Sequence, residues 1–176
     1  MRLTVPVIAR VHGTPIGVGC NFALASDLIV ASEDAQFGQV FIKIGLMPDG
    51  GSTFFLPHLV GYQKAFELTA LGDIISAREA ERIGFVNRVV PAPDLDETVD
   101  LLARRLIEAP NIALKNIKAA LNQNLQRDLA AALEFEAVGQ DACFHSPDFI
   151  EGIEAFIEKR RPVFNQSRSS RAQAAQ

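Results

Sequence analysis

The feature that most constrains the fold is a glycine-rich turn between an apolar strand and a short helix. The run Val5–Val11 is apolar and rich in β-branched residues, which predicts a strand. The small-residue stretch Cys20–Ser26 is compatible with a helix, and Gly13, Gly17 and Gly19 lie in the turn between them. Such a turn leaves unpaired main-chain N–H groups at the start of the helix, where a negative charge can be held. This order of elements favours an α/β fold.

Three interpretations of this turn are open from the residues alone. In the first, the glycines only relieve backbone strain in a tight turn. In the second, Gly17 and Gly19 match the first two glycines of a dinucleotide-binding loop, but Phe22 stands where a small residue is needed for close helix–strand packing. In the third, a main-chain N–H near Val18 forms an oxyanion hole that stabilises a developing enolate.

The remaining pattern predicts strands first and helices last. The next elements are a strand at Leu28–Ala31, a short strand at Gln36–Gln39, a second glycine-rich loop at Ile44–Thr53, a helix at Tyr62–Leu71, a helix capped by Ser76 that ends near Gly84, and a strand at Phe85–Val90. Four helices follow: Leu95–Glu108, one starting at Pro110, Asp128–Cys143, and one capped by Ser146 that runs to about Lys159. We therefore expect an α/β body with a helical C-terminal layer.

Composition and charge argue against several classes of partner. With 17 basic and 21 acidic residues, the formal net charge of −4 argues against a nucleic acid held by bulk electrostatics. No apolar run approaches the ~18 residues of a transmembrane helix, so no membrane partner is expected. Cys20 and Cys143 are far apart and lack a neighbouring Cys/His pattern. This argues against a zinc site or a disulfide framework and predicts a cytoplasmic protein.

An ordered series of motifs resembles the enoyl-CoA hydratase/isomerase (crotonase) family. The motifs are Pro6–Gly13, Gly17–Cys20, Ala23–Asp27, Ala35–Gly38, Gly45–Thr53, Leu71–Ala77, Gly84–Val90 and Glu151–Arg160. The resemblance covers nearly the whole chain and corresponds to the later part of the family's sequence. It implies a crotonase-like ββα spiral core, incomplete at its N-terminus, over residues 1–92, a helical trimerisation region over 93–166 and a disordered tail over 167–176.

The resemblance implies binding of an acyl-CoA thioester, with coenzyme A as part of the substrate, no further cofactor and no metal. In the family, two main-chain N–H groups hold the thioester oxygen and stabilise the enolate. By position, Val18 supplies one of them, between Gly17 and Gly19, which would border the bound thioester. The family usually has glycine in place of this valine, and its other donor lies in an upstream segment with no counterpart here. The resemblance also implies a homo-oligomer, either a trimer or a hexamer.

The residues at the proton-transfer positions distinguish between the two reactions of the family, hydration and isomerisation. Hydratases of the family use two glutamates, and the matching positions here are Asn21 and Phe41, which cannot transfer a proton. Water addition is therefore disfavoured. In isomerase branches, such as those resembling the isomerase of the phenylacetyl-CoA pathway, an aspartate occupies the position of Asp49. The alternative is that Asp49 only caps a helix beginning near Gly50.

Further residues are candidates for the acyl and CoA sites. Candidate walls of an apolar pocket around the aspartate are Phe41, Leu46, Met47 and Phe54. Phe156 and Lys159 match the C-terminal helix that reaches CoA in the family, with core packing and plain solvation as the alternatives. His12 and His58 lack a nucleophile or metal partner at a useful spacing, and we expect them to be structural.

The sequence thus predicts double-bond isomerisation of an enoyl-CoA through an enolate, with Val18 as oxyanion donor and Asp49 as the single base. One carboxylate suffices, because it takes a proton from one carbon and returns it to another. A second hypothesis is a catalytically inactive, truncated member of the family that acts as a binding or oligomerisation fragment. Turnover of a 3-enoyl-CoA distinguishes the two.

Overall fold

The computed structural model describes residues 3–125 and 127–166, so the predicted tail over 167–176 lies outside the described residues. The chain divides into two compact units. One, here called the α/β unit, comprises Val7–Ala103; the other, the helical unit, combines Met1–Pro6 with Arg104–Gln176. Within the described ranges, no helix has the length and apolar character needed to cross a membrane.

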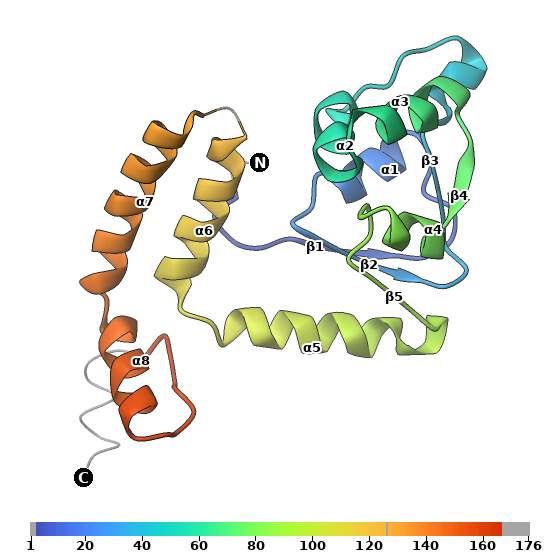
Figure 1. Ribbon diagram of the computed structural model, residues 1–176. Coiled ribbons are helices and arrows are strands. Elements are labelled where there is room, and N and C mark those ends of the chain that lie inside the picture. The colour runs from blue at the N-terminus through green and yellow to red at the C-terminus, as the bar shows by residue number, and fades with distance from the viewer. Residues whose placement is uncertain (1–2, 126, 167–176) are drawn as a thin grey trace. The chain divides into compact units, whose positions relative to one another are not determined.

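Two small sheets organise the α/β unit (Figure 1). Its strands are β1 (Ile8–Val11), β2 (Leu28–Ser32), β3 (Gln36–Gly38), β4 (Ile74–Ser76) and β5 (Arg88–Val90). The order β1-β2-β5 forms a parallel sheet in which Val30 lies opposite Arg88. β3 and β4 form an antiparallel pair in which Phe37 lies opposite Ile75. The central strand β2 is buried over most of its length, as its continuous apolar run requires.

Short helices cover these sheets. They are α1 (Val18–Leu24), the 3-10 helix η1 (Val40–Ile44), α2 (Ser52–Val60), α3 (Tyr62–Leu71), α4 (Ala77–Arg82), the 3-10 helix η2 (Ala92–Asp94) and the start of α5 (Leu95–Ile107). α1 contacts β1 and α2, and α2 packs on α3 (Figure 1). In the core, Phe37 meets Phe85 edge to face with ring centroids 4.9 Å apart, and Cys20 and Leu56 are buried in the same cluster. This core holds α1, and with it the first glycine-rich turn, against the sheet.

The helical unit consists of longer helices. They are the end of α5, then α6 (Asn111–Asn124), α7 (Leu129–Phe144) and α8 (Pro147–Ile157). α6 and α7 lie side by side (Figure 1). The Asp128 carboxylate accepts a hydrogen bond from the Ala131 N–H at the start of α7, and the Ser146 hydroxyl accepts one from the Phe149 N–H at the start of α8. Both caps confirm the helix starts predicted from the sequence.

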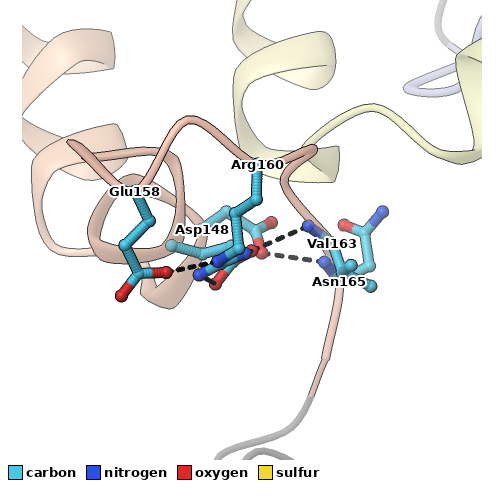
Figure 2. A network of polar contacts seen from close by, with 6 residues as sticks. Asp148, Glu158, Arg160, Val163 and Asn165 are labelled. Atoms are coloured by element: carbon cyan, nitrogen blue, oxygen red, sulfur yellow. Dashed lines mark hydrogen bonds and ion pairs between the residues drawn. The ribbon is translucent and has the colours of Figure 1, made fainter. Parts of the chain in front are cut away.

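A polar network holds the segment that follows α8 (Figure 2). The buried carboxylate of Glu151 accepts two hydrogen bonds from the Arg160 guanidinium, at 2.6 and 3.1 Å, and one from the Val163 N–H at 2.8 Å. The buried Asp148 accepts from the N–H of Asn165 at 2.8 Å. Asn165 adopts the left-handed region with φ 63°, which asparagine tolerates better than most residues. The segment thus folds back onto α8 through buried, charge-assisted contacts.

Two predicted strands are shorter than expected. The strand predicted at Val5–Val11 begins at Ile8, because Pro6 has no N–H to donate to a ladder. The strand predicted at Phe85–Val90 is reduced to its last three residues. The N–H groups of Phe85 and Val86 instead donate to the Ala80 carbonyl, at 2.9 and 3.1 Å, and so complete the end of α4.

Two other elements depart from the sequence prediction. β4 was not predicted as a strand, because three residues that are mostly exposed carry little periodic signal. The apolar run after the second glycine-rich loop forms α2, which contains Pro57 in its interior.

Two helices agree with the sequence prediction. The predicted helix Tyr62–Leu71 has the predicted bounds and ends at Gly72 in the left-handed conformation. Ser76 caps α4 by accepting from the Glu79 N–H at 3.2 Å, as the capping-box pattern indicates.

Candidate active site

The first glycine-rich turn has a backbone conformation that requires glycine. Gly17 has φ 54° and ψ −124°, a region from which a side chain is sterically excluded. Its N–H donates to the Gly38 carbonyl at 2.9 Å, which ties the turn to the end of β3. A Cβ built on Gly17 would lie 3.5 Å from the ring of Phe41, so this buried ring packs directly against the turn. The conformation of the turn is therefore supported by contacts within the fold.

The Val18 amide of the turn is left for an external acceptor. The Gly17 N–H is used by Gly38, and the Gly19 N–H donates to the Ile16 carbonyl at 3.1 Å. Val18 is the first residue of α1, and within the part of the chain that the structure describes its N–H donates to no acceptor. Val18 is 45% exposed. Three residues, Gly17, Val18 and Gly19, were predicted to border the thioester. Among them, Val18 has a free N–H donor, whereas the N–H groups of Gly17 and Gly19 donate to carbonyl groups of the chain itself.

The second glycine-rich loop presents Asp49 at the surface. Asp49 is exposed, while its main-chain carbonyl accepts hydrogen bonds from the Ser52 N–H and the Ser52 hydroxyl, both at 3.1 Å. α2 begins at Ser52, its N-cap is Gly51 in the left-handed conformation, and no side chain caps it. The alternative in which the Asp49 carboxylate caps the helix is therefore wrong. The main-chain carbonyl of Asp49 stabilises the start of α2, and its carboxylate takes no part in this cap.

A further hydrogen bond connects Asp49 to α1. The side-chain Nδ2 of Asn21, in the first turns of that helix, donates to the Asp49 carbonyl at 2.9 Å. Its Oδ1 accepts from the Nε2 of Gln39 at 2.7 Å, and both side chains are buried. From the sequence, Asn21 was expected only to replace a glutamate of the family, and no role was predicted for Gln39. The available signal was a polar residue on the buried side of a short apolar helix.

Two of the expected walls of an apolar pocket around Asp49 lie at the surface. Leu46 and Met47 are 54% and 74% exposed, and the loop that carries them has Gly45 in the left-handed conformation. Phe41 is buried under the first glycine-rich turn. The roles of Phe41 and Leu46 in substrate binding stay predictions.

The buried thiol of Cys20 lies in the core beneath the turn. Burial raises the pKa of this thiol to about 11, against smaller opposing effects of the Gln39 side chain and the Gly38 backbone. A protonated, inaccessible thiol is a poor nucleophile, so Cys20 is a packing residue.

Within the described ranges, no group of three or more His, Cys, Asp or Glu side chains could hold a metal ion.

The predicted CoA contacts of the C-terminal helix belong to the helical unit. Phe156 is 82% exposed near the end of α8, and Lys159 follows that helix in the left-handed conformation with φ 56°. The packing alternative for Phe156 is not supported, since most of its surface is free. Contact of either side chain with CoA stays a prediction. His58 lies within α2 with its Nδ1 2.6 Å from the Phe54 carbonyl, which agrees with a structural role.

Comparison with known proteins identifies the family. The model of the enoyl-CoA hydratase/isomerase family matches residues 1–168. The chain belongs to the enoyl-CoA hydratase/isomerase family. It is 40% identical over 159 residues to the crotonyl-CoA hydratase of Syntrophomonas wolfei, covering 90% of this chain. It is 37% identical over 163 residues to the 1,2-epoxyphenylacetyl-CoA isomerase of Escherichia coli, covering 93% of this chain.

The fold agrees with this membership. The crystal structure of enoyl-CoA hydratase subunit I from Geobacillus kaustophilus matches with a TM-score of 0.91 and 41% identity, covering 94% of this chain and 65% of that one. The α/β, crotonase-type fold predicted from the sequence is thereby confirmed. The chain spans 61% and 62% of the length of the Syntrophomonas wolfei and Escherichia coli relatives. Membership of this family gives no support to the dinucleotide-binding interpretation of the first turn.

Proposed function

We propose that this member of the enoyl-CoA hydratase/isomerase family binds an acyl-CoA thioester and moves the double bond of an enoyl-CoA through an enolate. The relatives include both hydratases and an isomerase by name. The observation that carries the isomerase proposal is the pairing of one free main-chain donor, at Val18, with one exposed carboxylate, at Asp49. Asn21 joins the helix of the donor to the loop of the carboxylate.

Hydration is disfavoured by the two residues at the family's glutamate positions. Neither Asn21 nor Phe41 can give or take a proton. Asn21 is 2% exposed, and both ends of its amide are engaged in hydrogen bonds, so it is committed to the fold. Phe41 packs under Gly17. Adding water across a double bond by the two-carboxylate route needs groups that these positions do not supply.

The proposed reaction uses Asp49 twice. Its carboxylate removes a proton from C2 of a 3-enoyl thioester, and the electron pair of the broken C–H bond moves into the thioester as an enolate. The Val18 N–H donates to the enolate oxygen, where the negative charge develops. The protonated Asp49 then returns the proton to C4, the C3–C4 double bond becomes C2–C3, and the thioester carbonyl reforms. No net proton or electron is gained or lost.

Conversion of 3-enoyl-CoA to 2-enoyl-CoA by the full chain tests this proposal. The absorbance of the conjugated thioester follows the reaction. We expect Asp49→Asn to lower kcat by at least about 100-fold, because the amide cannot accept the proton. Asp73→Asn makes the same chemical change at another exposed aspartate of the α/β unit and is expected to leave kcat unchanged. Equal activity of the wild type and Asp49→Asn would rule out the assigned base.

A binding or oligomerisation role without turnover is the second candidate. One observation favours it: the apolar side chains of Leu46 and Met47, which were expected to line an acyl pocket, are exposed. The partners would then be an acyl-CoA and further copies of this chain, as a trimer or hexamer. Exposed apolar side chains on α8, Ile150, Ile153, Phe156 and Ile157, support self-association. Acyl-CoA binding by calorimetry, with no turnover and with a trimer or hexamer in sedimentation velocity, would favour this candidate.

A further inference from the structure

We propose that Asn21 is a positioning residue of the site, which locks the Asp49 loop onto the helix that begins at Val18, and that Gln39 sets the orientation of its amide. The proposal rests on the proposed function, because it assigns a role relative to the base and the oxyanion donor. It differs from the proton-transfer role that the family's hydratases give to this position.

The hydrogen bonds allow one orientation of the two amides. The Asp49 main-chain oxygen can only accept, so Asn21 must turn its Nδ2 toward it, as the 2.9 Å contact shows. The Oδ1 of Asn21 then faces Gln39, and Gln39 must offer its Nε2, at 2.7 Å. Because the chain of contacts starts at a main-chain carbonyl, the direction of each amide follows from chemistry alone. Gln39 therefore fixes the orientation of the Asn21 amide that binds the Asp49 carbonyl.

Packing leaves the loop no room to shift toward the helix. Gly50 has φ 57°, and a Cβ built on it would lie 3.3 Å from Nδ2 and 3.4 Å from Cβ of Asn21. The loop backbone therefore rests directly on the Asn21 side chain, in a conformation that glycine alone adopts without strain. Asn21 supports the loop both by contact and by a hydrogen bond. Its own N–H donates to the Gly17 carbonyl at 3.1 Å, in the first turn of the helix that carries Val18.

The local turn of the Asp49 loop does not depend on Asn21. The Asp49 carbonyl also accepts from the N–H and the hydroxyl of the buried Ser52. Loss of the Asn21 hydrogen bond therefore leaves this carbonyl satisfied, and the start of α2 intact. What is lost is the connection between the loop and α1. A displacement of about 1 Å at a reacting group costs on the order of 100-fold in rate, so the connection matters for catalysis more than for folding.

Two variants test the proposal in the full chain. Asn21→Leu keeps a similar volume and removes the hydrogen bonds. In Gln39→Glu, the ionised carboxylate can only accept, so the Asn21 amide is expected to turn its Nδ2 away from Asp49. Asn116→Leu is the matched control, because Asn116 Nδ2 donates to the Gly139 carbonyl in the helical unit at 3.2 Å. We expect both test variants to lower kcat by about 10- to 100-fold with KM changed less than about 3-fold, and the control to change neither.

The pH profile separates positioning from loss of fold. Lowering the pH protonates the introduced carboxyl of Gln39→Glu, which can then donate to Asn21 Oδ1, so kcat of this variant relative to the wild type should recover. Asn21→Leu has no group that could restore the contact and should show no recovery. A fall in kcat that is the same at every pH in Gln39→Glu, or kcat within about 3-fold of the wild type in Asn21→Leu, would overturn the proposal.

Backbone NMR tests the proposal independently of turnover. We expect Asn21→Leu and Gln39→Glu to lower the order parameters of Gly50 and Gly51 from about 0.85 toward about 0.6, and Asn116→Leu to leave them unchanged. Unchanged order parameters in both test variants would overturn the positioning role. A wild-type chain that turns over no 3-enoyl-CoA would refute the proposed isomerase. The loop dynamics would then still decide whether Asn21 holds the loop.

Discussion

Replacing Val18 by proline removes the proposed oxyanion donor and little else. Val18 is the first residue of α1, the helix position at which proline is best tolerated. Its N–H has no acceptor in the described chain, so no internal hydrogen bond is lost. The residue before it, Gly17, has no Cβ to clash with the proline ring. Val18→Pro therefore removes one N–H group at a helix position where proline fits without strain.

The expected magnitude follows from the role of the donor. Removing one preorganised donor to a developing oxyanion costs about 100- to 1,000-fold in kcat, or about 3–4 kcal/mol of transition-state stabilisation. The cost to folding should be below about 1 kcal/mol, because the valine side chain is already 45% exposed. The two effects differ enough to be measured separately. A large loss of activity with a small change in stability is the expected signature.

Steady-state turnover of 3-enoyl-CoA and thermal unfolding are the two measurements. Val18→Ala serves as the matched control, since it keeps the N–H and trims the side chain. We expect Val18→Ala to stay within about 3-fold of the wild type in kcat, because the main-chain donor is unchanged. If Val18→Pro kept most of the wild-type kcat while folded, or if Val18→Ala lost as much as Val18→Pro, the main-chain donor would not be the stabilising group.

Two further predictions concern stability. Because burial raises the pKa of Cys20 to about 11, the folded state keeps a proton that the unfolded chain loses, so the free energy of unfolding should fall as the pH rises from about 9 to about 11. The fall is on the order of 2 kcal/mol, and urea unfolding of Cys20→Ala should not show it. Glu151→Ala leaves Arg160 and the Val163 N–H without their buried partner and should destabilise the chain by about 3 kcal/mol. Glu158→Ala removes an exposed partner of the same arginine and should cost less than about 1 kcal/mol in the same unfolding experiment.

Helix starts could be predicted from the sequence because their signals are local. Ser76, Asp128 and Ser146 each cap a helix by accepting from an N–H group three residues later. Such a contact depends on a few neighbouring residues and on little of the tertiary structure. The same holds for Gly72, which ends α3 in the left-handed conformation. Local chemistry therefore predicted most of the helical framework.

The interior of the candidate site could not be predicted in the same way. Asn21 is held by Gln39 and Asp49, which lie 18 and 28 residues away in the sequence. Their contact depends on the packing of α1 against two loops, which no local pattern encodes. Likewise, Leu46 and Met47 have the composition of pocket walls, but their loop lies at the surface and leaves them exposed. Apolar character alone does not show whether a side chain is covered.

The parallel sheet of the α/β unit also bears on the order in which the chain folds. The contact between Val7 and Asp27, where β1 meets β2, spans 20 residues, whereas the contact between Ile29 and Asn87, where β2 meets β5, spans 58. Closing the longer loop costs about 1 kcal/mol more entropy. We therefore expect the β1–β2 pair to form first and β5 to dock last. During translation, β5 can join β2 only after α2, α3 and α4 have left the ribosome.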